Sequence, residues 1–166
     1  MKHHISAKLM TVFCLLPVLS LVCPQPADAR QSASVLARQG NSALMKNDNH
    51  KAVATLSEAL VAGSMPVYAR ASVLNDRGLA YTRMKKYELA LKDFNQAIES
   101  FPEFDKAYNN RGLLLHLLGH YKEAIKDFNR AIALQPDVGA TFHNRGNSLL
   151  KAGAEKSAFR DFGKAV

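Results

Sequence analysis

The sequence is poor in cysteine: of its 166 residues only Cys14 and Cys23 are cysteines, and both precede residue 24. The rest of the chain therefore excludes disulfides, thiol nucleophiles, cysteine-ligated zinc and covalent haem attachment. Catalytic sequence patterns are missing too, including Gly-x-Ser-x-Gly, His-Glu-x-x-His and phosphate-binding loops. His116 and His120 are four residues apart, but Gly119 interrupts the helix that would align them as zinc ligands. We therefore expect no enzyme activity, no cofactor and no metal.

Long hydrophobic runs are also missing. The apolar segment 9–22 has 14 residues and contains Pro17, whereas a membrane-spanning helix needs ~20 residues. Lys2 and Lys8 precede this segment, and the small-x-small pattern Ala27-Asp28-Ala29 follows it. This order is typical of a secretory signal peptide. We predict that residues 1–29 are cleaved between Ala29 and Arg30.

Two alternatives to cleavage remain at the N-terminus. An uncleaved membrane anchor would require a longer apolar segment. A lipid-modified Cys23 would normally follow a small residue, but Val22 precedes it. We therefore expect no stable membrane anchor, and export to the periplasm, with secretion as the second option.

The remaining sequence repeats with a period of 34 residues. The strings L-N-D-R-G-L-A-Y and Y-N-N-R-G-L-L-L are followed by A-L-K-D-F-N-Q-A-I and A-I-K-D-F-N-R-A-I. A third copy reads F-H-N-R-G-N-S-L and then A-F-R-D-F-G-K-A-V. A period of this size is typical of stacked helical hairpins, each of which needs its neighbours to bury its apolar face. The residues in step are Gly78, Gly112 and Gly146; Ala90, Ala124 and Ala158; Phe94, Phe128 and Phe162; and Pro102 with Pro136.

With these residues the chain resembles the tetratricopeptide repeat family, and in particular an exported bacterial type. The resemblance implies an all-α fold, a right-handed superhelical array of antiparallel helix pairs (an α–α solenoid). It covers roughly residues 33–166 of a domain predicted at residues 30–166, with repeats at 33–66 (degenerate), 71–104, 105–138 and 139–166 (truncated). Gly40 precedes Gly78 by 38 residues, four more than the period. We place this extra helical turn between Gly63 and Ala71, where Ser64 and Pro66 would start a helix.

The repeat predicts eight helices in four pairs, and Asn47, Gly119 and Gly153 would end helices in a left-handed conformation. The glycines and alanines would let paired helices approach closely, while the phenylalanines fill the space between pairs. The predicted ranges are 33–46 with 49–62, 67–84 with 87–100, 105–118 with 121–134, and 139–152 with 155–166.

Arginine stands before each repeated glycine, where the family has leucine. Arg77, Arg111 and Arg145 recur in step with Asp93, Asp127 and Asp161. A largely buried guanidinium needs a partner, so we predict a ladder of internal ion pairs in preference to an anion site.

In tetratricopeptide arrays the first helix of each pair lines a concave groove. The resemblance therefore places a set of polar residues there as a partner-binding surface. Their amides would bond an extended peptide backbone, or would simply tolerate a hydrated groove; the sequence leaves both open. The family's clamp for terminal carboxylates is poorly reproduced, since Asp76 would repel a carboxylate. The set is Arg38, Asn41, Asn75, Asp76, Lys106, Asn109, Asn110, His143, Asn144 and Asn147.

These features predict a non-enzymatic adaptor that binds a protein or an extended peptide. The net charge of +8 comes from interleaved charges, which indicates a solvated surface and no nucleic-acid partner. The alternative is a self-associating subunit, or an accessory domain of a larger assembly, that uses an uncapped C-terminal helix carrying Phe159, Phe162 and Val166.

Overall fold

A computed structural model describes residues 26–63 and 65–165, with side chains from residue 32 onward. Its regular structure within these residues consists of eight α-helices. They are α1 (Pro26–Met45), α2 (Asn49–Val61), α3 (Val67–Arg83), α4 (Tyr87–Ser100), α5 (Asp105–Leu117), α6 (Tyr121–Leu134), α7 (Gly139–Lys151) and α8 (Glu155–Lys164).

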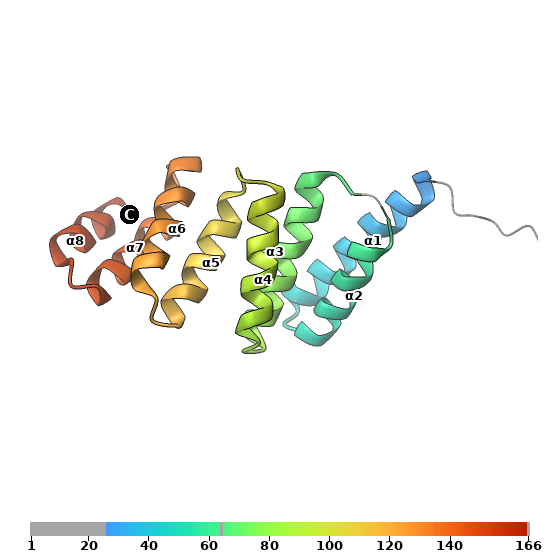
Figure 1. Cartoon of the computed structure of the whole chain (residues 1–166), viewed down its shortest axis with the longest axis horizontal. Coiled ribbons are helices and arrows are strands. Elements are labelled where there is room, and N and C mark those ends of the chain that lie inside the picture. The colour runs from blue at the N-terminus through green and yellow to red at the C-terminus, as the bar shows by residue number, and fades with distance from the viewer. Residues whose placement is uncertain (1–25, 64, 166) are drawn as a thin grey trace, which may run out of the picture.

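Consecutive helices form four pairs that follow one another along the long axis of the molecule (Figure 1). The main contacts join α1 to α2, α3 to α4, α5 to α6 and α7 to α8, and each second helix also packs on the first helix of the next pair. The fold is therefore the all-α solenoid that the sequence predicts.

The helices from α2 to α8 begin where the repeat predicts. The extra turn is also confirmed: α3 has 17 residues, whereas α5 and α7 have 13 each, and Pro66 caps the start of α3. Ser64 lies outside the described residues. The predicted start of the first helix at residue 33 is wrong, because α1 begins at Pro26. Proline is well suited to a first helical turn, and α1 has no preceding repeat to define its start.

Four residues with positive φ lie between the two helices of their pairs. They are Asn47 (64°), Lys85 (59°), Gly119 (83°) and Gly153 (80°), which share one register of the repeat. Three of them were predicted from residue type. Lys85 was missed because lysine rarely adopts this conformation. Its position in the repeat, equivalent to those of Gly119 and Gly153, could have predicted it.

The core of each pair consists of a glycine on the first helix and a bulky side chain on the second. A Cβ atom added at Gly78 would lie 2.8 Å from Phe94 Cε1, and one at Gly112 would lie 2.8 Å from Phe128 Cε1. The predicted place of the phenylalanines between pairs is therefore incomplete. Phe94 does cluster with Leu114 of the next pair, but its ring also fills the space above the glycine of its own pair.

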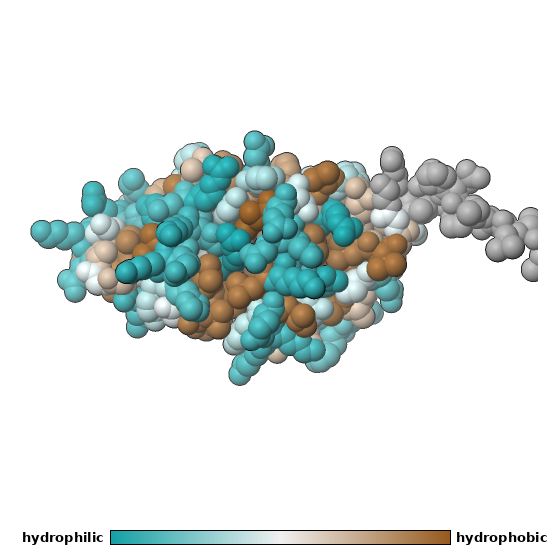
Figure 2. All heavy atoms as spheres, in the orientation of Figure 1, coloured by the Kyte–Doolittle hydropathy of each residue, from teal (hydrophilic) through white to brown (hydrophobic). Residues whose placement is uncertain are grey.

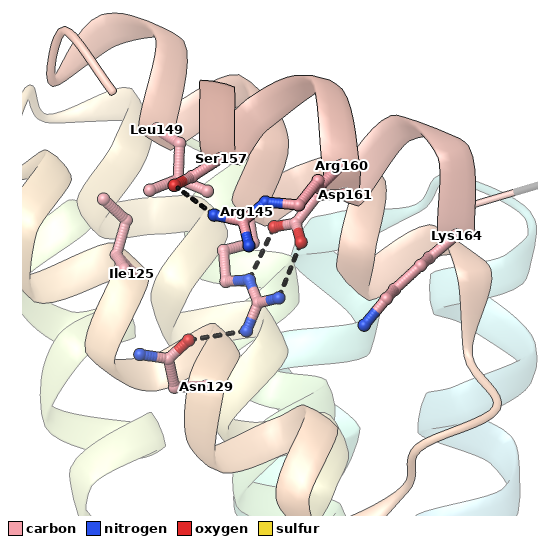
Figure 3. Close-up of a pocket in the computed structure, with 8 residues that line it drawn as sticks. All are labelled: Ile125, Asn129, Arg145, Leu149, Ser157, Arg160, Asp161 and Lys164. Carbon is pink, nitrogen blue, oxygen red and sulfur yellow. Dashed lines mark hydrogen bonds and ion pairs between the residues drawn. The ribbon is translucent and has the colours of Figure 1, made fainter. Parts of the chain in front are cut away.

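The predicted ion-pair ladder is confirmed, and it does more than join the two helices of a pair. Arg111 donates to both carboxylate oxygens of Asp127, at 2.7 Å each, and its third nitrogen donates to Asn95 Oδ1 of the preceding pair at 2.7 Å. Figure 3 shows the same arrangement for Arg145, which lies between Asp161 of α8 and Asn129 of α6. Each arginine thus connects three helices.

The contacts between helices of successive pairs show in which direction the array curves. First helices contact one another, α1 with α3, α3 with α5 and α5 with α7, whereas the described residues of α2, α4, α6 and α8 make no such contacts with each other. The first helices therefore lie on the inner side of the curve. In the view of Figure 2, hydrophilic side chains cover most of the surface between separate hydrophobic patches.

Candidate functional site

The predicted groove residues lie on the inner, first helices. Arg38 and Asn41 are on α1, Asn75 and Asp76 on α3, and Lys106 on α5. Arg38, Asn41 and Lys106 are exposed, whereas Asn75 is buried and Asp76 is partly buried. Asn109 and Asn110 on α5 and His143, Asn144 and Asn147 on α7 complete the set, each exposed or partly buried.

Amides of this set bond to one another across neighbouring first helices. Asn110 Nδ2 donates to Asn75 Oδ1 at 2.8 Å, and Asn144 Nδ2 donates to Asn109 Oδ1 at 3.2 Å. Each bond joins residues 35 apart, so the helices pair amides of adjacent registers. Residue spacing alone did not predict these bonds, because the sequence does not show how far neighbouring helices are staggered.

The bonding divides the asparagines into two groups. Asn75 is only 3% exposed, and its carbonyl oxygen accepts the proton of Asn110. This pair therefore belongs largely to the internal structure. Asn109 Nδ2, Asn110 Oδ1 and the side chain of Asn147 form no hydrogen bond with other described residues, so they remain available to a ligand.

Asp76 lies at the centre of the N-terminal part of the groove. Its Oδ1 accepts from Asn75 and its Oδ2 accepts from Asn41, both at 3.2 Å. Burial raises the pKa of the Asp76 carboxyl, while the Asn75 hydrogen bond and the charge of Lys106 act in the opposite direction with smaller effect. A carboxylate with a raised pKa is poorly solvated, and it would gain from a cation or a hydrogen-bond donor.

A cavity of about 280 Å³ opens beside Asp76 between α1 and α3. Arg38, Asn41 and Asp76 provide its polar lining, and the rest comes largely from apolar or small side chains. These are Ala37 on α1, Met65 and Pro66 in the preceding loop, and Tyr68, Ala69 and Val73 on α3, with Ser34 and Ser72.

The C-terminal part of the groove contains two histidines, His116 and His143. The imidazole of His143 lies 5.5 Å from the ring of Phe162, measured between centroids. His116 of α5, which the set did not include, bonds Ser148 of α7 at 2.8 Å. Its position before the α5–α6 turn gave no sequence signal for this contact. Lys106 is exposed on α5 and adds positive charge.

A second cavity of about 400 Å³ lies among α6, α7 and α8 (Figure 3). It is lined by Ile125, Asn129, Arg145, Leu149, Ser157, Arg160, Asp161 and Lys164. Because the Arg145 guanidinium there is already bonded to Asp161 and Asn129, its charge is satisfied internally. Arg145 is therefore not free to bind a ligand in this cavity.

Other predicted features lie at the edge of, or outside, the described residues. Most of the predicted signal peptide, residues 1–25, is outside them, and Ala29 and Arg30 fall within the first turns of α1. The described helices include none that is both long and apolar enough to span a bilayer. No group of three or more His, Asp or Glu side chains suited to a metal ion occurs among the described residues.

Comparison with family models agrees with the geometry of the two central pairs. Residues 71–104 and 105–138 each match the tetratricopeptide repeat model. Residues 71–138 are thus similar to two consecutive tetratricopeptide repeats. The match begins at Ala71, after the extra turn of α3, as the sequence spacing predicts. A comparison with curated proteins gives no match.

Solved structures share the fold, among them tetratricopeptide repeat domains. The first such domain of Spaghetti (RPAP3), bound to the HSP90 peptide SRMEEVD, is 26% identical with a TM-score of 0.68, covering 74% of this chain and 94% of that one. MamA is 20% identical with a TM-score of 0.71, covering 80% and 75%. YrrB, described as having an unusual peptide-binding site, is 22% identical with a TM-score of 0.67, covering 81% and 67%.

Proposed function

We propose that this protein is a non-enzymatic adaptor whose inner helices bind an extended peptide segment of a protein partner. The observation that carries the proposal is the set of unused amide groups on the inner helices α5 and α7. Asn109, Asn110 and Asn147 retain donors or acceptors that no described residue uses. Backbone amides of an extended peptide can satisfy such groups irrespective of side-chain sequence.

The fold supports this proposal, because stacked helix pairs present a long curved surface and tetratricopeptide repeats are typical protein-interaction modules. The solved RPAP3 domain, a structure of similar fold, is bound to a peptide. In this chain Asp76 accepts two amide protons inside the groove. A ligand bound here would therefore not place a carboxylate next to Asp76.

The proposal is tested by selecting binders from a library of random linear peptides displayed on phage, using the purified native protein. We expect Asn147→Ala to weaken the selected peptides' binding, since Asn147 lies on the inner helix α7 and its side chain forms no hydrogen bond with other described residues. Gln96→Ala, which removes an exposed amide on the second helix α4, is the matched control. Hydrogen exchange with bound peptide should slow in α3, α5 and α7. Slowing of hydrogen exchange confined to the second helices, or failure to select any peptide, would refute binding in the groove.

Asn110→Ala is a poor test of binding. Asn110 donates to the buried Asn75 oxygen, so truncation would leave that acceptor unsatisfied and lower stability.

Self-association is the second candidate function, and Phe159 on α8 favours it. Phe159 is 68% exposed. Ile125 occupies the same position of the preceding repeat, and it lines a cavity together with Leu149 of the next first helix. A second copy packing on α8 would cover this ring. Light scattering should then give a mass above that of the monomer, and Phe159→Asp should restore the monomer mass.

We propose further that the protein is exported, on the basis of the charged, apolar and small-residue segments at its N-terminus. Cleavage after Ala29 would remove residues 26–29 of α1 and leave residues 30–45 of that helix. Mass spectrometry of the protein from fractionated cells should find Arg30 as the first residue in an exported pool. A protein retaining Met1 would contradict export by this route.

A further inference from the structure

Two departures from the regular repeat meet at one place in the structure. The first is the insertion of one turn before Ala71, which supplies Met65, Pro66, Tyr68 and Ala69. The second is Asp76, which occupies the register of Asn110 and Asn144. Both line the cavity between α1 and α3. The corresponding places between α3 and α5 and between α5 and α7 have neither the inserted turn nor the acid.

The apolar wall of this cavity is held by aromatic packing. Tyr68 lies edge-on to Phe101 and to Phe104, with ring centroids 5.5 Å apart in each case. Phe104 is itself buried in a cluster with Leu74. Tyr68 is still 54% exposed, so its position is fixed while part of its surface remains open to a ligand.

The size of the cavity limits what can enter. Sites that enclose a whole small-molecule ligand usually have ~300–1,000 Å³, and this open cavity has about 280 Å³. It is therefore suited to one large apolar side chain of a longer chain. Burial of such a side chain removes its apolar surface from water, and this favours one register of the bound peptide over the others.

Charge decides which residue would accompany the apolar one. Asp76 accepts two amide protons, while a carboxylate offers about four acceptor sites, and no described lysine or arginine forms an ion pair with it. Arg38, which lines the same cavity, and Lys106, whose charge acts on Asp76, are both exposed, so water screens their charges. Charges interact more strongly where they are desolvated, and Asp76 therefore dominates recognition.

From this geometry we infer that the cavity between α1 and α3 recognises an apolar side chain next to a lysine or arginine of the partner peptide. The apolar group enters among Met65, Tyr68 and Val73, and the cation bonds the free acceptor sites of Asp76. The inference rests on the proposed function and deepens it by giving the partner's chemistry.

Sequencing of the peptides selected on the native protein tests this inference. We expect a large apolar residue beside lysine or arginine in most of them. Asp76→Asn should weaken a selected peptide about tenfold, which corresponds to ~1.4 kcal/mol. Exchanging the peptide's basic residue for glutamine should cost the same on the native protein and almost nothing on the variant. Glu99→Gln, an exposed acid on α4, is the matched control and should change nothing.

Two further variants keep the result interpretable if Asp76→Asn alters the fold. Ser72→Phe should fill the cavity and weaken peptides with a large apolar residue more than matched peptides with alanine. Selection on Asp76→Lys should enrich acidic residues in place of basic ones. Thermal melting of each variant identifies those that remain folded.

The outcomes separate this inference from the function on which it rests. Selected peptides that lose affinity on Asn147→Ala but carry no apolar–basic pair would overturn the inference and leave the groove intact. Apolar residues flanked by acids would make Arg38 the recognising group and would also overturn it. If no peptide binds the inner helices, both the inference and the proposed function are wrong.

Discussion

At the scale of single residues, Lys85 is the described position least suited to its backbone. An L-residue in the left-handed region costs roughly 1–2 kcal/mol, and Lys85 has φ of 59° where the equivalent residues of later pairs are glycines. Glycine loses more conformational freedom on folding, about 0.5–1 kcal/mol, which offsets part of that gain. The net effect favours glycine at this turn.

We therefore predict that Lys85→Gly raises the free energy of unfolding by up to about 1 kcal/mol. Urea denaturation followed by circular dichroism measures the change. Lys86→Gly is the control, because Lys86 has φ of −89° and needs no glycine; it should lower stability or leave it unchanged. Equal effects of the two substitutions would show that the conformation of Lys85 is not strained.

Asp76 gives a prediction about pH. Since burial raises its pKa in the folded state, the folded protein holds this proton at higher pH than the unfolded chain does. The ionised carboxylate therefore destabilises the fold at neutral pH, and this penalty is relieved as pH falls through the folded pKa toward the ordinary value of about 3.9.

The native protein should consequently gain stability relative to Asp76→Asn as the pH falls from 7 to about 4. Thermal melts of both proteins across this range measure the difference, in which the titrations of all other groups largely cancel. A difference that is constant with pH would show that the Asp76 carboxylate is well solvated in the folded state.

At the scale of helices, the arginine ladder is the main polar connection between pairs. The hydrogen bonds from Arg111 to Asp127 raise the pKa of the Arg111 guanidinium above its usual range, so the group stays charged. The two side chains are 23% and 8% exposed. Removal of one partner would leave the other poorly hydrated.

Arg111→Met should therefore cost about 3 kcal/mol of unfolding free energy, as expected for breaking a largely buried pair. Arg111→Met combined with Asp127→Leu should recover part of that loss, because no unpaired carboxylate remains. Chemical denaturation of the two single variants and the double variant completes the cycle. Strict additivity of the three values would mean that the contact contributes no coupling energy.

Helix positions were predictable from the sequence because several residues repeat together. Glycine, alanine, phenylalanine and proline in fixed order define both ends of each pair from α3 onward. The start of α1 was not predictable in this way, since no repeat precedes it. The bonds from Asn75 to Asn110 and from Asn109 to Asn144 also escaped prediction. They depend on the stagger between helices, which a repeat length does not contain.

The candidate site was predictable in outline only. The resemblance placed Arg38, Asn41 and Asp76 on the inner helices, and the structure brings all three to one cavity. The apolar wall was missed, because Met65 and Tyr68 belong to an insertion that has no counterpart in the other repeats. A departure from a repeat is visible in the sequence, but its contacts depend on the folded arrangement.

At the scale of the whole molecule, the array should tolerate loss of one complete period. Removing residues 105–138 would place Arg145 opposite Asn95 and Asn144 opposite Asn75, in the roles that Arg111 and Asn110 now have. We expect a folded, helical protein with a lower melting temperature and a smaller denaturant dependence, because less surface is buried.

Circular dichroism during urea unfolding measures both quantities. Removing residues 107–138 is the matched control: it leaves two residues too many between Asn95 and Arg145, which changes the spacing of the ladder, and should lower the melting temperature further. If both shortened chains unfold alike, the 34-residue period does not determine how the pairs stack.

Beyond its own pair, each arginine of the ladder also donates a hydrogen bond to the pair that precedes it in the sequence. Arg111 on α5 bonds Asp127, on the helix that completes its own pair, and Asn95, on a helix made earlier. Arg77 likewise reaches back to Ser57, and Arg145 to Asn129. No arginine of the ladder requires a residue beyond its own pair. During synthesis each pair can therefore settle on its predecessor as soon as its second helix is free, without waiting for the residues that follow.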